Sequence, residues 1–107
     1  MSELSELNKA INSLNDLWPL LIGEEMESVL REKNKLNDKA SELAHKSLLE
    51  GVPELSDAIE QLKLVTQSAN DAKESIDQVA ERINKVADTI EKTASAVVKV
   101  ASLIAVL

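Results

Sequence analysis

The sequence predicts an all-α protein organised as a long antiparallel helical hairpin, and three observations support this fold class. Every seventh residue from Leu55 to Ile104 is apolar, as on one face of a long helix. A second row follows three residues after each member and is apolar except at Thr93. The 107 residues include only two Gly and two Pro, so few turns are expected. Phe and Tyr are absent and Trp18 is the only Trp, which leaves Leu, Ile, Val and Ala to fill narrow seams between helices.

The first predicted helix covers about residues 2–17. Ser2 is a residue type favoured at a helix N-cap, and the apolar residues that follow recur at spacings of three and four. These apolar residues are Leu4, Leu7, Ile11 and Leu14. Pro19 removes a backbone donor and clashes with the preceding turn, and Gly23 follows shortly after it. We therefore expect the first arm to be kinked or broken near Pro19–Gly23.

The second predicted helix covers about residues 24–50 and ends at a turn over residues 51–53. Glu24 and Glu25 suit the positive end of a helix, because the helix dipole attracts negative charge there. At the other end, Gly51 can adopt the left-handed conformation that closes a helix, and Pro53 is well suited to the first turn of the next one.

The third predicted helix covers about residues 54–107 and would extend roughly 80 Å at about 1.5 Å per residue. A chain of this size has no globular core that could cover such a length, so the helix must lie against another long helix. Folding the chain at residues 51–53 places residue i near residue 104 − i, and the apolar-rich and apolar-poor stretches of the two arms then coincide. This agreement predicts a hairpin that uses nearly the whole chain as a single domain, residues 1–107.

The apolar stripe of the second arm is wider than a two-helix seam requires, because a third, weaker apolar row accompanies the first two. Dimerisation of two hairpins into a four-helix bundle would bury the excess. A complete break near Pro19 would give a three-helix bundle instead. We expect self-association to involve one residue near the break and a set along the second arm. These residues are Trp18, Ile76, Ile83, Ile90, Val97, Val100, Ile104 and Leu107.

The net charge of −7 argues against a nucleic-acid backbone as a partner, because such partners are bound by cationic patches. The charge is spread evenly along the chain: residues 1–53 hold 6 basic and 10 acidic groups, and residues 54–107 hold 6 and 9. No acidic tail or basic arm is present in the sequence.

Catalytic and metal-binding patterns are weak. Glu42 and His45 match the Glu-x-x-His pattern of di-metal helical bundles, but their helical phase relative to Leu36 and Leu43 points both toward water. His45 is the only His, Cys is absent, and no Gly-rich phosphate loop occurs. We expect no enzyme activity, no metal and no cofactor.

The sequence therefore predicts a non-enzymatic, helical protein–protein interaction or assembly module whose partners are itself, as a homodimer, and another helical protein. Residues 1–6 lack the basic and apolar segments of a signal peptide and the chain lacks Cys, so we expect a cytoplasmic protein. One alternative is a membrane-surface-active protein, a toxin component or lipid binder, that uses Ala94–Leu107. That segment offers few basic residues, which makes the membrane the less favoured partner. A second alternative is an acidic inhibitor or immunity protein.

Overall fold

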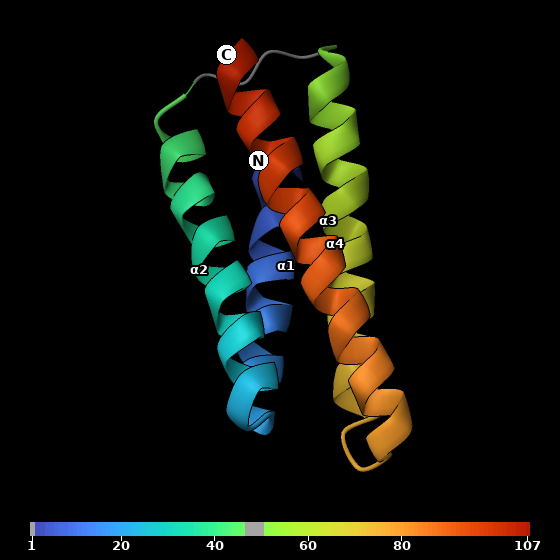
Figure 1. Cartoon of the computed structure of the whole chain (residues 1–107). Coiled ribbons are helices and arrows are strands. Elements are labelled where there is room, and N and C mark those ends of the chain that lie inside the picture. The colour runs from blue at the N-terminus through green and yellow to red at the C-terminus, as the bar shows by residue number, and fades with distance from the viewer. Residues whose placement is uncertain (1, 47–50) are drawn as a thin grey trace.

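The computed structural model of the chain describes residues 2–46 and 51–107, with side chains from residue 5 onward in these ranges. The described residues form helices and contain no strand. The elements are α1 (Ser2–Leu17), a short 3-10 helix η1 (Trp18–Leu20), α2 (Gly23–Ala44), α3 (Pro53–Glu74) and α4 (Val79–Val106). The all-α fold class is confirmed. The four α-helices form one elongated bundle of 43 × 19 × 19 Å (Figure 1).

The bundle consists of two antiparallel helix pairs packed side by side (Figure 1). The first pair is α1 with α2, and the second is α3 with α4, which is the most extensive packing in the molecule. Between the pairs, α1 packs on α3 and α2 packs on α4, so helices that run in the same direction are neighbours. Although α2 and α3 are consecutive in the sequence, they lie across a diagonal of the bundle and have little contact. The predicted antiparallel pairing of residue i with residue 104 − i is therefore wrong.

The expected break near Pro19–Gly23 is present, and it reverses the chain. Leu17 ends α1, and the Leu21 N–H donates to the Trp18 carbonyl at 3.1 Å to close the 3-10 turn. Gly23 begins α2 with a positive φ of 61°, a conformation that costs glycine little. The reversal lets α1 and α2 bury their apolar faces within the same bundle.

The expected turn at residues 51–53 is also present. Gly51 has a φ of 85°, and Pro53 is the first residue of α3. The preceding helix is shorter than predicted: α2 ends at Ala44, with His45 as its C-cap residue. The remainder of the predicted helix, residues 47–50, lies outside the described residues.

The predicted continuous helix over residues 54–107 is wrong, because the chain reverses between Glu74 and Val79. The Ser75 N–H donates to the carbonyls of Asp71 and Ala72 at 3.2 and 3.1 Å, and the Gln78 N–H donates to the Ser75 carbonyl at 3.0 Å. The reversal allows α3 and α4 to bury their stripes against each other and against α1 and α2, whereas one long helix would leave that apolar surface without a partner. One chain thus supplies all four helices of a bundle that we had expected from two chains, and the three-helix alternative does not occur.

Each helix contributes buried residues at spacings of three, four or seven to the common core. The buried apolar residues of α1 are Leu7, Ala10, Leu14 and Leu17, and those of α2 are Val29, Leu36 and Leu43. In α3 they are Ala58, Leu62, Val65, Ala69 and Ala72, and α4 contributes Val86, Thr89, Thr93, Ala96, Val100 and Leu103. Three of the buried residues of α3 and one of α4 are Ala, and small residues allow close packing of helices.

The seven-residue row that faces the core in α3 is not the row that faces the core in α4. Leu62 and Ala69 of one row are buried in α3, but the continuation of that row at Ile83 is half exposed in α4. A row one residue earlier, which includes Thr89 and Ala96, takes its place. The seven-residue spacing of apolar residues runs through the turn without a gap, so the spacing alone does not reveal the change of phase.

Candidate interaction surface

The structure covers most of the residues predicted to mediate self-association. Val100 is fully buried in the core of the single chain. Six more are partly buried and pack against the core, namely Trp18, Ile76, Ile90, Val97, Ile104 and Leu107. Ile83 is the one residue of the eight that is more than half exposed. The apolar stripe is thus used within the chain and does not form one continuous external seam.

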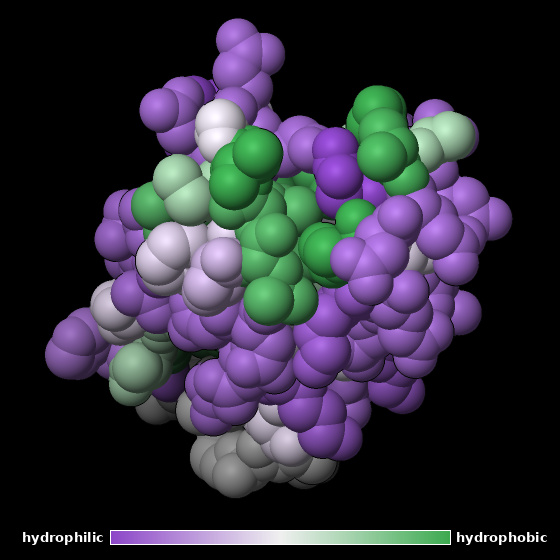
Figure 2. Space-filling view, turned by 90° about the horizontal axis from the view of Figure 1, so that it is seen from below, coloured by the Kyte–Doolittle hydropathy of each residue, from purple (hydrophilic) through white to green (hydrophobic). Residues whose placement is uncertain are grey.

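Ile83 and three apolar residues outside the predicted set are exposed at the end of the bundle that carries both short reversals (Figure 1). Leu20 and Ile22 lie in the link between α1 and α2, while Val79 and Ile83 lie in the first two turns of α4. Their exposed fractions are 49%, 81%, 60% and 52%. A view onto this end shows hydrophobic side chains gathered near its centre with hydrophilic side chains around them (Figure 2). We call Leu20, Ile22, Val79 and Ile83 the end surface.

Local backbone geometry explains why these side chains are exposed. In the link after α1, Leu21 is the residue that enters the core, at 3% exposure, and its neighbours on both sides point outward. Ile22 is the extended N-cap residue of α2, with φ −134° and ψ 160°. Val79 begins α4 about two turns before Val86 enters the core, so this end of the helix extends past the buried rows.

An ion pair joins the two halves of this end. Arg82 on α4 places its Nε 3.2 Å from Oε1 of Glu25 on α2, and both side chains are about three-quarters buried. The other carboxylate oxygen of Glu25, Oε2, is covered and has no hydrogen-bond partner among the described residues. A shallow groove of about 250 Å³ continues from the end surface between α2 and α4, lined by Ser28, Ile83 and Ile90 among others.

Folding gathers negative charge at this same end. Residues 15–27 and 71–85, which form the end of the bundle, hold eight acidic and three basic residues, so they carry −5 of the chain's net charge of −7. The acidic residues are Asp16, Glu24, Glu25, Glu27, Asp71, Glu74, Asp77 and Glu81, and the basic ones are Lys73, Arg82 and Lys85. The charge is even along the sequence but concentrated in space, because both reversals bring acidic segments to the same place.

Trp18 lies beside the end surface, in η1. Its ring is partly buried against the core, and its Nε1 donates to Oδ1 of Asn15 at 3.3 Å. Because the chain has no other aromatic residue, the fluorescence of Trp18 reports on this end alone.

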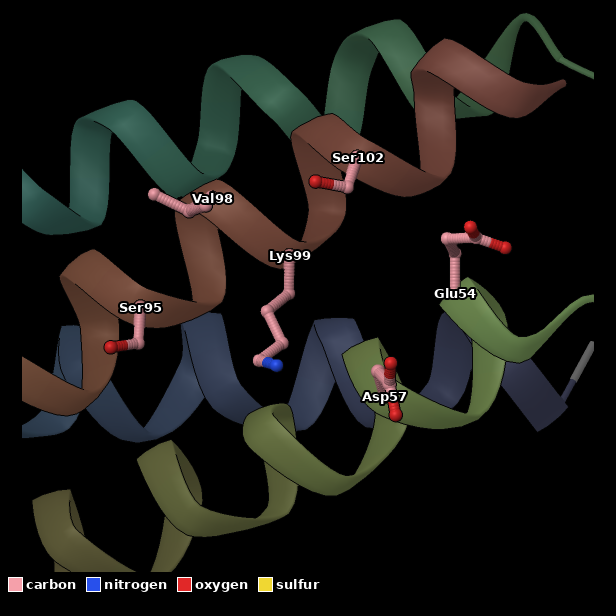
Figure 3. A pocket seen from close by; sticks show the side chains of 6 residues that line it. All are labelled: Glu54, Asp57, Ser95, Val98, Lys99 and Ser102. Carbon is pink, nitrogen blue, oxygen red and sulfur yellow. The ribbon is translucent and has the colours of Figure 1, made fainter.

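A second groove, of about 410 Å³, lies toward the opposite end between α3 and α4 (Figure 3). Glu54 and Asp57 line it from α3, and Ser95, Val98, Lys99 and Ser102 line it from α4. Lys99 extends from α4 toward α3 in this groove (Figure 3). Five of its six lining residues are polar or charged, and Val98 is the one aliphatic residue among them.

A polar cluster lies between α3 and α4. The Ser68 hydroxyl donates to Asp88 Oδ2 at 2.7 Å and lies 2.9 Å from the Thr89 hydroxyl. Lys92 Nζ lies 3.2 Å from the other oxygen of Asp88. The hydrogen bond from Ser68 outweighs the effect of burial and, with Lys92, lowers the pKa of Asp88 below its ordinary value of 3.8. Each group in this cluster is satisfied, so its arrangement is that of a structural connection between helices.

The Glu-x-x-His pair lies on the outside of the bundle. Glu42 is exposed and 3.4 Å from Lys39 Nζ, and His45 is an exposed residue just after α2. In residues 2–46 and 51–107, no three His, Cys, Asp or Glu side chains gather where they could hold a metal ion. Across the same residues, no helix combines the length and the apolar character needed to cross a bilayer.

No family model, curated protein or solved structure matches this chain. The candidate surface is therefore identified from the physical features of this molecule. The end surface combines the largest exposed aliphatic fraction in the described residues, that of Ile22, with an adjacent groove and a concentration of charge.

Sequence reasoning missed three of the four residues of the end surface. A signal for two of them was present, since Leu20 and Ile22 belong to an apolar run beside a predicted helix break. Val79 belongs to the second apolar row and was expected inside a helix seam. Its position at the same end of the bundle as Leu20 and Ile22 depends on the reversal at residues 75–78, a segment that contains no Gly or Pro.

Proposed function

We propose that this protein is a non-enzymatic helical interaction module that binds a helix of another protein on its end surface. The observation that carries the proposal is the exposure of Leu20, Ile22, Val79 and Ile83 together at one end of an otherwise well-packed bundle. Exposed apolar side chains that gather beside a groove are typical of binding sites for amphipathic helices.

The size of the apolar surface suits reversible binding. Covering the exposed parts of the four side chains contributes roughly 4–7 kcal/mol, at about 1.5–3 kcal/mol for each fully buried aliphatic side chain. Association costs a comparable free energy in lost motion. A partner that also occupies the groove along Ile83 and Ile90 gains the additional contact it needs.

Self-association through the interior stripe is less favoured than the sequence suggested. Val86, Thr93 and Val100 are buried within one chain, so a homodimer built on them would first have to open the bundle. The membrane alternative on Ala94–Leu107 meets the same obstacle, because Ala96, Val100 and Leu103 from that segment face the core. The acidic inhibitor alternative is a special case of the present proposal, in which the partner is an enzyme or toxin with a basic site.

The test uses a fluorescein-labelled model helix with an apolar face of Leu and a neutral polar face of Gln and Ala, about five turns long. We expect it to bind in the micromolar range by fluorescence anisotropy. The double variant Leu20→Ser/Ile22→Ser should weaken binding about tenfold or more, since truncation of central apolar residues dominates interface energies. Circular dichroism should show the variant folded, because neither side chain belongs to the core.

The matched control is Leu64→Ser/Val98→Ser, which removes two exposed aliphatic side chains far from the end surface. We expect this control to bind the peptide as the unmodified protein does. Equal affinities for the two double variants, or no binding by any of the proteins, would contradict the proposed function.

A further inference from the structure

We infer that the helix bound at the end surface carries a cationic polar face. This inference rests on the proposed function and adds the chemistry of the partner. The end of the bundle formed by residues 15–27 and 71–85 carries −5 of the net charge of −7, and the same end exposes the four apolar side chains. The rest of the chain carries only −2.

The acidic side chains around the end surface are accessible to a partner. Glu24, Glu74 and Asp77 are all exposed, and none of them has an ion-pair partner within 4.0 Å among the described residues. Of the three basic residues at this end, Arg82 is already engaged with Glu25. The negative charge is thus presented outward rather than neutralised within the fold.

This combination selects one kind of occupant. An amphipathic helix with Leu-like residues on one face and Lys or Arg along its flanks would cover the apolar residues and place cations near Glu24, Glu74 and Asp77. Each exposed ion pair with the partner contributes little to the affinity. The net charge of −5 nevertheless produces a field that speeds association with a cationic partner and disfavours an acidic one.

The same charge disfavours the other occupants. A second copy docked end to end would place two surfaces of charge −5 against each other. Like charges brought together at an interface destabilise it. The anionic face of a membrane is repelled for the same reason. For a cationic amphipathic helix, both the burial of apolar surface and the electrostatic attraction favour binding.

The test compares three peptides that share one apolar face and differ only in having Lys, Gln or Glu at the polar positions. At about 20 mM salt we expect the Lys peptide to bind about tenfold more tightly than the Gln peptide, and the Glu peptide to bind more weakly still. At about 500 mM salt the Lys and Gln peptides should differ by less than about threefold, because screening removes the electrostatic part.

A charge-neutralising variant locates the effect. Glu24→Gln/Glu74→Gln/Asp77→Asn should lose most of the preference for Lys over Gln, because it should weaken binding of the Lys peptide much more than binding of the Gln peptide. The control Asp38→Asn/Glu60→Gln/Glu91→Gln removes three exposed acidic groups elsewhere and should keep the preference. Light scattering on the free protein measures whether it dimerises in the absence of a peptide.

The outcomes separate the two proposals. Binding of all three peptides with equal affinity, lost in Leu20→Ser/Ile22→Ser, would overturn the cationic partner and leave the proposed function standing. Equal loss of preference in both triple variants would also overturn it, since only the total charge would then matter. A free protein that dimerises through Leu20 and Ile22 would identify a second copy as the occupant. Failure of every peptide to bind would overturn the proposed function itself.

Discussion

Thr89 and Thr93 occupy two central positions of α4 that apolar residues fill in most helix seams. Both are buried, and each hydroxyl donates to a backbone carbonyl four residues earlier, at 2.8 and 2.7 Å. The cost of burying a hydroxyl is therefore offset by a local hydrogen bond. Hydroxyls satisfied in this way allow two polar residues to occupy buried positions in α4.

The hydroxyl of Ser68 sets the ionisation of Asp88, and its removal should be measurable. We expect Ser68→Ala to raise the pKa of Asp88 toward 3.8, because the hydrogen bond that lowers it most is lost. An NMR titration of the Asp88 side-chain carboxyl measures this. Ser41→Ala removes a hydroxyl that bonds only to the Asn37 carbonyl and should leave Asp88 unchanged.

The same pKa has a consequence for stability. A folded pKa below the unfolded one means that ionised Asp88 stabilises the fold above pH 3.8, and that this stabilisation is lost as the pH falls through the lower, folded value. Ser68→Ala should therefore reduce the contribution of ionised Asp88 to the stability of the fold. An unchanged pKa in Ser68→Ala would contradict the dominant role assigned to the Ser68 hydrogen bond.

Ile83 and Val86 are both apolar residues of α4, but the structure assigns them different roles. Ile83→Asp should change the free energy of unfolding by less than about 1 kcal/mol, because an exposed charge remains hydrated. Val86→Asp should cost more than about 3 kcal/mol, since the carboxylate would be buried without a partner. Urea denaturation followed by circular dichroism measures both values, and equal losses would contradict the phase assigned to α4.

At the scale of elements, the chain reversals differ in how far they can be predicted. The breaks at Pro19–Gly23 and at Gly51–Pro53 contain residues whose backbone preferences end helices, and both were predicted. The reversal at residues 75–78 contains neither Gly nor Pro, and none of its residues needs a positive φ. The apolar spacing also passes through it without interruption. The composition and spacing therefore predict helices but not the number of times that the chain turns.

The same missed reversal limited the prediction of the site. An apolar run at residues 17–22 was recognisable, but its neighbour in space is the start of α4. Two segments about 60 residues apart come together only because both reversals lie at one end of the bundle (Figure 1). The concentration of charge was hidden for the same reason, since an even distribution along the chain says nothing about its distribution in the fold.

A distance measurement tests the reversal directly. Asp57 and Ser102 line the same groove between α3 and α4, so spin labels on Asp57→Cys/Ser102→Cys should lie within about 25 Å. In a continuous helix the 45 intervening steps would separate them by roughly 65 Å at about 1.5 Å per residue. The chain has no Cys of its own, so only the introduced sites are labelled. Double electron–electron resonance distinguishes the two distances.

The control pair for this measurement lies within one helix. Labels on Asp57→Cys/Glu74→Cys, both on α3, should be about 25 Å apart whether or not the chain reverses, at about 1.5 Å per residue. A long distance in the first pair together with the expected distance in the second would restore the continuous helix.

At the scale of the whole molecule, the bundle is made of two hairpins, and each provides half of the end surface. Leu20 and Ile22 belong to the α1–α2 hairpin, and Val79 and Ile83 belong to the α3–α4 hairpin. The ion pair between Glu25 and Arg82 also spans the two hairpins. Neither half of the chain carries the surface alone, so the surface exists only where the hairpins are packed together.

The division of the end surface between two hairpins makes the molecule a natural two-fragment system. A cut in the connection between α2 and α3 would leave fragments that each lack half of the surface, and binding would return only as the fragments reassemble. A partner that binds both halves would hold the fragments together and raise their apparent affinity for each other, by mass action. During synthesis, likewise, the surface is completed only after Ile83 has been made and the second hairpin has folded against the first.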